Sequence, residues 1–324
     1  MEPIAKILVY GDIHLNSKNY GAHKDYKKES LEMFRNITQT AENHGVTHII
    51  GLGDFTYGRF NTLEYRDAVE HELMRQYEIT KGNRWELKGN HDTATYGMTE
   101  YEYYLKKGMF KPAENLQIGN LNLSMINYGE HRKKSIIQPE QDKVNVVLMH
   151  DFFKFEASQM PNYGDCYILD NFEPWYGVDY IFGGHIHKME TTSGSIVKEG
   201  YAHECSVMYL GCPCRPSYRE GHMDDKGYYV LITVYPTAET AENGVEIQIL
   251  DFELPSIESI FALEERQNEE ERLAQKRVDV SDIVQKLDKH TRVIGEPEDK
   301  IMALEGINEV YKLKAIKLLK EGQG

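Results

Sequence analysis

The sequence predicts a mixed α/β protein, and three observations support this class. Short apolar runs of strand length recur along the first two thirds of the chain. Polar segments of helical length separate the first three runs, which is typical of α/β alternation. Later runs follow one another across Gly and Asn turns, as strands do in hairpins. Together these patterns indicate a mixed sheet.

Each predicted element has its own signal. The predicted strands are rich in β-branched or aromatic residues and end at Gly or a polar cluster, at 7–10, 47–52, 85–87, 144–149 and 180–182. Two helices are predicted between the first three strands, at about 24–44 and 62–79, with Leu31, Phe34 and Ile37 spaced by three. Hairpin strands are expected in 115–129, 208–235 and 245–254.

The composition changes after Leu254 and Pro255. Residues 256–289 are dominated by Glu, Arg, Lys and Gln, which predicts a solvated helix or tether. Beyond Pro297 an amphipathic helix is predicted, whose apolar stripe is Leu304, Ile307, Tyr311, Ala315 and Leu318. The chain thus divides into a main domain at 1–235, a short capping-like β segment at 236–256 and a charged helical tail at 257–324.

The charge balance is acidic: 37 Lys and Arg against 52 Asp and Glu give a net charge of −15 over 324 residues. This excess disfavours unspecific adhesion to nucleic acid or anionic membranes, which needs clustered basic residues. Hydrophobic residues make up 40% of the chain, as in ordinary globular proteins. If this acidic protein acts on phosphates, its active site is therefore expected to bind cations.

We expect a cytoplasmic protein, in a bacterial or phage-infected cell. No apolar run approaches the roughly 18 residues that span a bilayer, and no signal peptide is expected. Four cysteines do not make a disulfide framework in a chain of this length. Cys212 and Cys214 lack a second pair at zinc-site spacing, so buried or incidental thiols are expected.

Polar clusters follow the predicted strands at five places: Gly11-Asp12-Ile13-His14, Gly53-Asp54, Gly89-Asn90-His91-Asp92, Met149-His150-Asp151 and Gly183-Gly184-His185-Ile186-His187. The carboxyl ends of strands in open α/β sheets are where ligands gather, so these side chains are expected to converge. Residues two apart in extended backbone share a face, which favours Asp12 with His14 and His185 with His187. Each motif alone is more often a turn or a strand end, but their joint occurrence favours a metal site.

The candidate ligands are Asp12, His14, Asp54, Asn90, His150, His185 and His187. This set is too large for one tetrahedral zinc, and it fits two divalent ions that share a carboxylate. Mn²⁺, Fe²⁺ and Zn²⁺ are all admissible with carboxylate, imidazole and amide donors. Two such ions clamp an in-line displacement at phosphorus, so phosphoester hydrolysis is the predicted chemistry.

The ordered pattern D-x-H, G-D, G-N-H-D, H and G-H-x-H resembles that of the calcineurin-like metallophosphoesterases. The resemblance implies a β-sandwich flanked by helices (αββα). It implies that Asp12, His14 and His187 bind one metal, that Asn90, His150 and His185 bind the other, and that Asp54 bridges both. His91 would be the catalytic histidine at the leaving oxygen, and Asp92 would orient it.

Within that family the chain is similar to nuclease subunits of the SbcCD-type double-strand-break repair complex and to phage recombination endonucleases. The likeness rests on three features: the stretch 178–187, the stretch 209–217 followed by 225–230, and the layout of a catalytic region, a β segment and a charged helical tail. It implies a Mn²⁺-dependent exonuclease or endonuclease at DNA ends, a homodimer, and an SMC-like coiled-coil ATPase as partner in repair, recombination or replication. The helix at 300–319 is a candidate for docking on the ATPase, and packing on its own domain is equally open.

Two positions depart from this narrower pattern. Tyr57 stands where His or Asp is frequent, and Cys212 replaces the usual Ser. Two other functions remain open: hydrolysis of a small phosphodiester, nucleotide or phosphoprotein, and a scaffold without activity. Intact Asn90, His91 and Asp92 argue against the scaffold.

Overall fold

The computed structural model describes residues 1–16, 23–58, 60, 62–93, 97–130, 137–161, 166–170, 172–215, 225–236 and 242–260. The chain divides into two compact units, Met1–Phe261 and Ala262–Gly324. The predicted tail helix at 300–319 and almost all of the predicted tail lie outside the described residues. No helix in the described part is long and apolar enough to cross a membrane.

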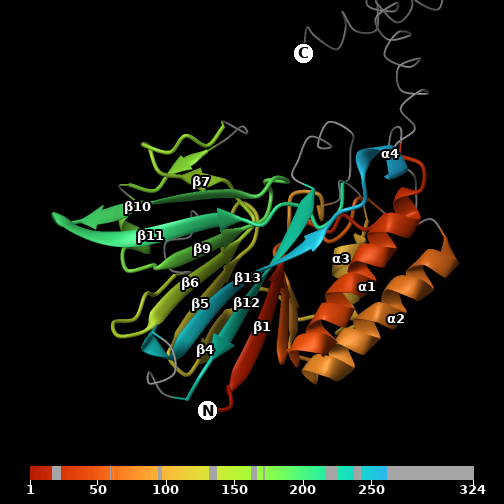
Figure 1. The fold of residues 1–324 in the computed structure, drawn as a ribbon, viewed down its shortest axis with the longest axis horizontal. Helices are drawn as coiled ribbons and strands as arrows, with labels where there is room; N and C mark the ends of the chain where they lie inside the picture. The colour runs from red at the N-terminus through yellow and green to blue at the C-terminus, as the bar shows by residue number, and fades with distance from the viewer. Residues whose placement is uncertain are drawn as a thin grey trace, which may run out of the picture. The chain divides into compact units, whose positions relative to one another are not determined.

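Two sheets form the centre of the first unit (Figure 1). The first sheet has the order β13-β12-β1-β2-β3. Its strands are β1 (Ala5–Tyr10), β2 (His48–Gly51), β3 (Arg84–Glu86), β12 (Lys226–Val234) and β13 (Val245–Glu253). Strands β1, β2 and β3 run parallel, whereas β12 is antiparallel to both β1 and β13.

The second sheet has the order β10-β11-β9-β6-β5-β4. Its strands are β4 (Asn115–Ile118), β5 (Leu121–Ile126), β6 (Val144–Met149), β9 (Tyr180–Gly183), β10 (Glu190–Lys198) and β11 (Tyr201–Tyr209). Strands β5, β6, β9 and β11 are parallel, and β4 and β10 are antiparallel edge strands. Both sheets are therefore mixed, as predicted.

Successive side chains of a central strand point to opposite faces of its sheet, and both faces are buried. Ile7 and Val9 of β1 pack between the two sheets, whereas Leu8 and Tyr10 face the helical layer. In β6, Val146 belongs to the core between the sheets, and the next residue along the strand belongs to the opposite outer core. Such strands read as continuous apolar runs, because neither face meets water.

Helices α1 (Tyr26–His44), α2 (Leu63–Thr80) and α3 (Glu100–Lys106) cover the outer face of the first sheet (Figure 1). Asp25 caps α1 by accepting from Lys28 N, and Gly45 ends it in the left-handed conformation. Thr99 and Glu102 form a capping box on α3. The short α4 (Ile257–Ile260) follows β13.

Irregular chain covers the outer face of the second sheet. The parallel pair β7 (Phe153–Lys154) and β8 (Tyr167–Ile168) lies there with the 3-10 turn η1 (Glu173–Trp175), over a core that includes Phe153 and Trp175. A second 3-10 turn, η3 (Glu242–Gly244), precedes β13. The αββα arrangement is thus built here from three helices on one side and aromatic-rich loops on the other, among the described residues.

The expected strands and the two long helices are confirmed within one or two residues of their predicted bounds. The expected hairpins are confirmed for β4 with β5 and for β12 with β13. The prediction of a hairpin in 208–235 is wrong, because β11 pairs with β9 and β10 in the second sheet, whereas β12 lies in the first. The chain changes sheets after Tyr209, where Gly211 packs against Gly11. Periodicity cannot reveal this crossing, because strands of either sheet share one pattern.

Candidate metal centre

The five motifs follow strands whose carboxyl ends meet at one edge of the sandwich. In the first sheet, β1, β2 and β3 lead into the loops of Asp12, Asp54 and Asn90. In the second sheet, β6 leads into His150 and β9 into the loop with His185. Contacts between these loops bring side chains together that are up to 173 residues apart in the sequence. The predicted convergence is therefore what the topology produces.

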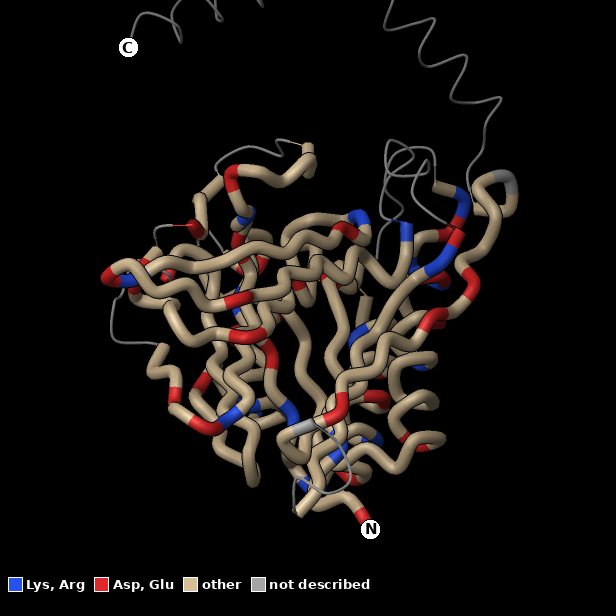
Figure 2. The backbone as a smooth tube through the Cα atoms, turned by 60° about the vertical axis from the view of Figure 1, so that its left-hand side comes forward, with Lys and Arg blue, Asp and Glu red and all other residues tan. Residues whose placement is uncertain are grey.

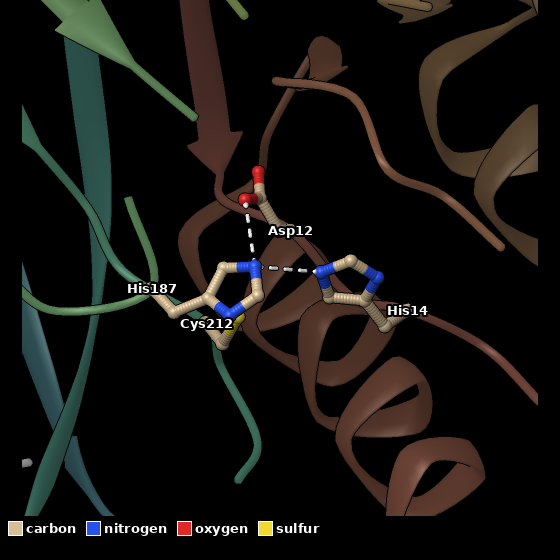
Figure 3. Close-up of side chains that lie close together, drawn as sticks. All are labelled: Asp12, His14, His187 and Cys212. Atoms are coloured by element: carbon tan, nitrogen blue, oxygen red, sulfur yellow. Dashed lines mark hydrogen bonds and ion pairs between the residues drawn. The ribbon is translucent and has the colours of Figure 1, made fainter. Parts of the chain in front are cut away.

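Asp12, His14 and His187 form what we call the first half of the centre (Figure 3). The Nε2 atoms of His14 and His187 are 3.0 Å apart, and His187 Nε2 is 3.7 Å from Asp12 Oδ2. Asp12 and His14 are completely buried, whereas His187 is partly exposed. The first half thus opens on the side of His187.

Asn90, His150 and His185 form the second half. Asn90 Oδ1 lies 2.9 Å from His150 Nε2 and 2.9 Å from His185 Nδ1. His150 Nδ1 lies 2.7 Å from the carbonyl oxygen of Leu52 and donates to it. When the ring is neutral, this hydrogen bond leaves Nε2 as the nitrogen whose lone pair faces the site, as in many metal-binding histidines.

Asp54 lies between the two halves. Its Oδ2 atom is 3.7 Å from His14 Nε2 and 3.4 Å from His150 Nε2. Its Oδ1 atom accepts a hydrogen bond of 2.8 Å from the backbone N–H of His91. One carboxylate therefore touches both groups of ligands, and all seven predicted ligands gather in one place.

The backbone at the centre is held in an unusual conformation. His14, Asp54 and His185 all have positive φ, at 48°, 49° and 76°. Non-glycine residues rarely adopt this left-handed region, and such strain concentrates at functional sites. Three ligands in this conformation indicate that the loops are shaped to aim side chains at a common point.

Glycines leave room for the ligands at two positions. A Cβ on Gly89 would overlap the carboxylate of Asp54, and one on Gly184 would overlap that of Asp12. Both glycines therefore let a neighbouring loop pass against a carboxylate with no intervening side chain.

Burial and mutual contacts shift the ionisation of the ligands. Burial raises the pKa of Asp12 to about 7, with His150 opposing and Asp54 adding to the effect. Burial acts in the same direction on Asp54, but His150 and His14 outweigh it and hold the pKa of Asp54 below its usual range. Burial works against a charge on His150, yet Asp54 and Asp12 raise its pKa to about 10. The raised pKa keeps a proton on His150 in the metal-free protein, and a divalent ion bound at Nε2 would displace it.

The donors fit cations in spacing as well as in type. Ligands about 2.1 Å from one ion and at right angles to each other are about 3.0 Å apart, which matches the 3.0 Å between His14 and His187 and the 2.9 Å from Asn90 Oδ1 to each imidazole. Asp12 Oδ2 lies somewhat farther from His187 Nε2, at 3.7 Å. Asp12 Oδ1 and His14 Nδ1 are buried with no hydrogen-bond partner among the described residues. When bound, two divalent ions would neutralise phosphate charge and activate water.

His91 lies exposed at the edge of the centre. Its ring centroid is 5.3 Å from that of His14 and 4.9 Å from that of Tyr57. Its neighbour Asp92 is fully buried and accepts from the backbone N–H groups of Gly89, Phe55 and Thr56 at 3.0 to 3.2 Å. Asp92 thus joins the loop of His91 to the loop of Asp54. Burial, then Asp54, raises the pKa of Asp92 to about 7.

The structure adds Cys212 and Tyr128, which sequence reasoning did not place here, and it brings Tyr57, three positions after Asp54, beside the first half. Cys212 lies with the first half, where the sequence indicated only a buried thiol. Tyr128 is 45% exposed beside the second half, with its ring 5.8 Å from that of His185. Tyr57 has its ring 5.9 Å from that of His14. The departures of Cys212 and Tyr57 from the expected pattern were the available signals.

The aromatic cluster of the third helix is core and not a part of the centre. Tyr101 and Tyr104 are buried under the first sheet, and the hydroxyl of Tyr101 donates to the carbonyl of Glu86. Their rings pack against Phe110 and Phe55, as core aromatics do.

Comparison with known proteins identifies one family and two similar structures. The profile of the calcineurin-like phosphoesterase family matches residues 5–189. A dimetal phosphatase from Danio rerio is similar at 11% identity, over 78% of this chain and 99% of that chain, with a TM-score of 0.43. An archaeal phosphodiesterase is similar at 13% identity, over 76% of this chain and 99% of that chain, with a TM-score of 0.34. No protein of curated function shows a significant match.

The family profile covers more than half of the chain, including all five motifs. The ligand types, their spacing and their burial fit a centre for divalent metal ions. The chain therefore belongs to the calcineurin-like phosphoesterase family and is a metal-dependent phosphoesterase.

Proposed function

We propose that this protein is a dinuclear-metal phosphodiesterase that cleaves DNA at its ends, as an exonuclease or endonuclease. The observation that carries the proposal is the convergence of seven ligands in two halves that share Asp54. This arrangement suits an in-line displacement at phosphorus, where both the attacking and the leaving oxygen need stabilisation.

The chain's own residues have separate tasks in this proposal. His91 is exposed beside the first half, where its ring can donate a proton to the leaving oxygen of the substrate. Asp92 is a positioning residue, because it holds the loop of His91 against the loop of Asp54. Tyr57 and Tyr128 flank opposite halves and offer ring faces to a nucleobase.

The preference for DNA rests on the likeness of three stretches to SbcCD-type nucleases. Two of them are joined directly: the buried Arg215 donates to Asp225 Oδ1 at 2.9 Å and also to the carbonyl of Pro255. The stretch 209–217 also contacts β7, because Tyr209 Oη accepts from Phe153 N at 2.6 Å and donates to Phe153 O at 2.9 Å. Through these contacts, the matched residues stabilise the fold.

The acidic surface is compatible with a DNA substrate if the cations provide the local positive charge. Acidic and basic positions are interspersed along the described chain (Figure 2). The lysines nearest the ligands in sequence, Lys88 and Lys188, pair with Glu102 and Glu190 at 3.4 Å each. We propose Mn²⁺ as the activating metal, and we propose that affinity for duplex DNA comes from partners.

Those partners are a second copy of this chain and an SMC-like coiled-coil ATPase. The proposed docking element is the amphipathic segment 300–319, which lies outside the described residues. Its apolar stripe would be buried in a groove of the ATPase. We further propose that the complex works in the cytoplasm.

The deciding experiment compares substrates with one metal-loaded preparation. Linear duplex DNA, hairpin DNA and a chromogenic phosphodiester are offered with Mn²⁺, with and without the ATPase. We expect cleavage of the linear duplex and no cleavage by His91→Ala. Turnover of the small diester together with inertness toward all DNA would support hydrolysis of a small phosphodiester or nucleotide instead.

Truncation after Gly295 tests the partner separately. We expect loss of ATPase association with unchanged hydrolysis of the small diester. Unimpaired co-purification of the truncated chain with the ATPase would refute the docking role.

A further inference from the structure

One thiol lies within the first half of the metal centre. The sulfur of Cys212 and the ligand atoms of Asp12, His14 and His187 all lie within 4.8 Å of one another (Figure 3). Cys212 is 5% exposed, and Asp12 and His14 are more deeply buried still. The four side chains come from three loops, which follow β1, β9 and β11.

The backbone delivers Cys212 to this place through specific contacts. After β11, Leu210 N donates to the carbonyl of Gly183, and Cys212 N donates to the carbonyl of His187 at 3.1 Å. Gly211 between them has a φ of 73°, and a Cβ there would lie 3.0 Å from His187 O. A Cβ on Gly11 would overlap the Gly211 carbonyl. Cys212 is therefore clamped between the loop of Asp12 and the loop of His187.

The other cysteines have different surroundings. Cys214, two residues further on, directs its sulfur to the carbonyl of Ile13 at 3.4 Å and lies 3.7 Å from the hydroxyl of Tyr26. Cys205 lies in the outer core of the second sheet. Cys166 is partly exposed beside β8. Cys212 alone joins a group of metal-ligating side chains among the described residues.

The atoms of the first half that face one another are suited to a shared ion. Asp12 directs its Oδ2 atom to His187 Nε2 at 3.7 Å. The Nε2 atoms of His14 and His187 face each other at 3.0 Å, a distance suited to two ligands of one cation. Besides Asp54, the sequence pattern assigned this cation one carboxylate and two imidazoles, and the thiol now lies in the same space.

We propose that Cys212 is a thiolate ligand of the ion held by Asp12, His14 and His187. The sulfur–metal bond forms as the thiol proton passes to the solvent, so charge and atoms balance. This inference rests on the metal centre of the proposed function. A sulfur donor makes the first half softer than the second, whose donors are oxygen and nitrogen. The first half therefore prefers Zn²⁺ or Fe²⁺ over Mn²⁺, and the activating Mn²⁺ of the proposed function is assigned to the second half.

The test uses the full-length chain, stripped of metal and then loaded with Co²⁺. A thiolate ligand produces a near-ultraviolet sulfur-to-cobalt charge-transfer band. We expect this band in the wild type and in the matched control Cys214→Ser, and we expect its loss in Cys212→Ser. Zn²⁺ affinity at the first half should fall about tenfold or more in Cys212→Ser, with a smaller change for Mn²⁺.

Binding of two Co²⁺ per chain without the charge-transfer band would overturn the inference and leave the proposed function intact. Binding of no metal by the wild type would overturn both. If Cys212→Ser does not fold, alkylation of the wild type decides: Zn²⁺ should slow modification of Cys212 about tenfold or more while Cys166 reacts unchanged. Equal reaction of Cys212 with and without bound Zn²⁺ would contradict ligation.

Discussion

The two halves of the metal centre share an edge of the sandwich but differ in surroundings. In the first half, two of the ligands are fully buried and a thiol lies within reach. In the second half, Asn90 Oδ1 lies 2.9 Å from a ring nitrogen of both His150 and His185. The exposed Tyr128 lies next to His185. The comparison teaches that one strand topology can place a more buried ion site beside a more open one. We expect the first half to hold its ion more tightly, and we expect the substrate to meet both halves, with His91 beside the first and Tyr128 beside the second.

The largest effect is expected from the residue that both halves share. Asp54→Ala should remove both metals and abolish turnover, because Asp54 Oδ2 contacts a histidine of each half. Elemental analysis of the purified variant checks the metal content. Two metals per chain in Asp54→Ala would show that the halves do not depend on this carboxylate.

A substitution at His91 should lower turnover without changing metal binding. His91→Asn should keep both metals and lower turnover about 10²- to 10⁴-fold, because a proton donor is lost while all seven ligands remain. Metal content and the rate constant are measured on the same sample. Parallel loss of metal would mean that His91 belongs to the centre itself.

Paired substitutions distinguish the halves from each other. His14→Ala should lose the ion of the first half, and His185→Ala the ion of the second, so each variant should retain about one metal. His14→Ala should also weaken the cobalt–sulfur band, whereas His185→Ala should preserve it. An identical loss in both variants would show that the two ions bind only together.

Tyr128 tests whether the open half meets the substrate. Tyr128→Ala should raise KM for DNA by roughly 5- to 100-fold, which corresponds to about 1–3 kcal/mol for one stacked base. Turnover of a small chromogenic diester should change little. The matched variant Tyr128→Phe keeps the ring and should restore the KM. A KM for DNA that is unchanged in Tyr128→Ala would remove this side chain from substrate binding.

The smallest effect is expected at His48, which lies outside both halves and contributes to the pH dependence of the free energy of unfolding. Burial, followed by Lys111, lowers the pKa of His48 from 6.5, and its ring stacks on Trp85 at 5.8 Å. A histidine whose pKa is depressed by folding stabilises the protein above its unfolded pKa and loses that contribution as the pH falls. His48→Gln should reduce the acid-induced loss of stability between pH 7 and 5 by under about 1 kcal/mol. Thermal melts of the metal-free proteins check this difference.

The sequence by itself determined strands β1, β2, β3, β6 and β9, the two long helices and the ligand motifs, whereas it did not indicate β7, β8, β10 or α3. Periodicity and composition report burial, so a strand buried on both faces such as β6 is recognisable from its apolar run. The motifs Asp12 to His14 and His185 to His187 are short and local, and their order along the chain was sufficient to indicate a metal site. Their convergence followed from parallel strands ending at one edge.

Only the tertiary structure decided which residues from other loops join those motifs. The crossing from β11 to β12 brings Gly211 against Gly11 and carries Cys212 into the first half. The ring of Tyr128, after β5, reaches His185, after β9, past the intervening strand β6. Neither contact leaves a periodic trace, because each depends on how two separate sheets pack. Local pattern thus specifies the elements, whereas long-range packing specifies the full set of neighbours around each ion.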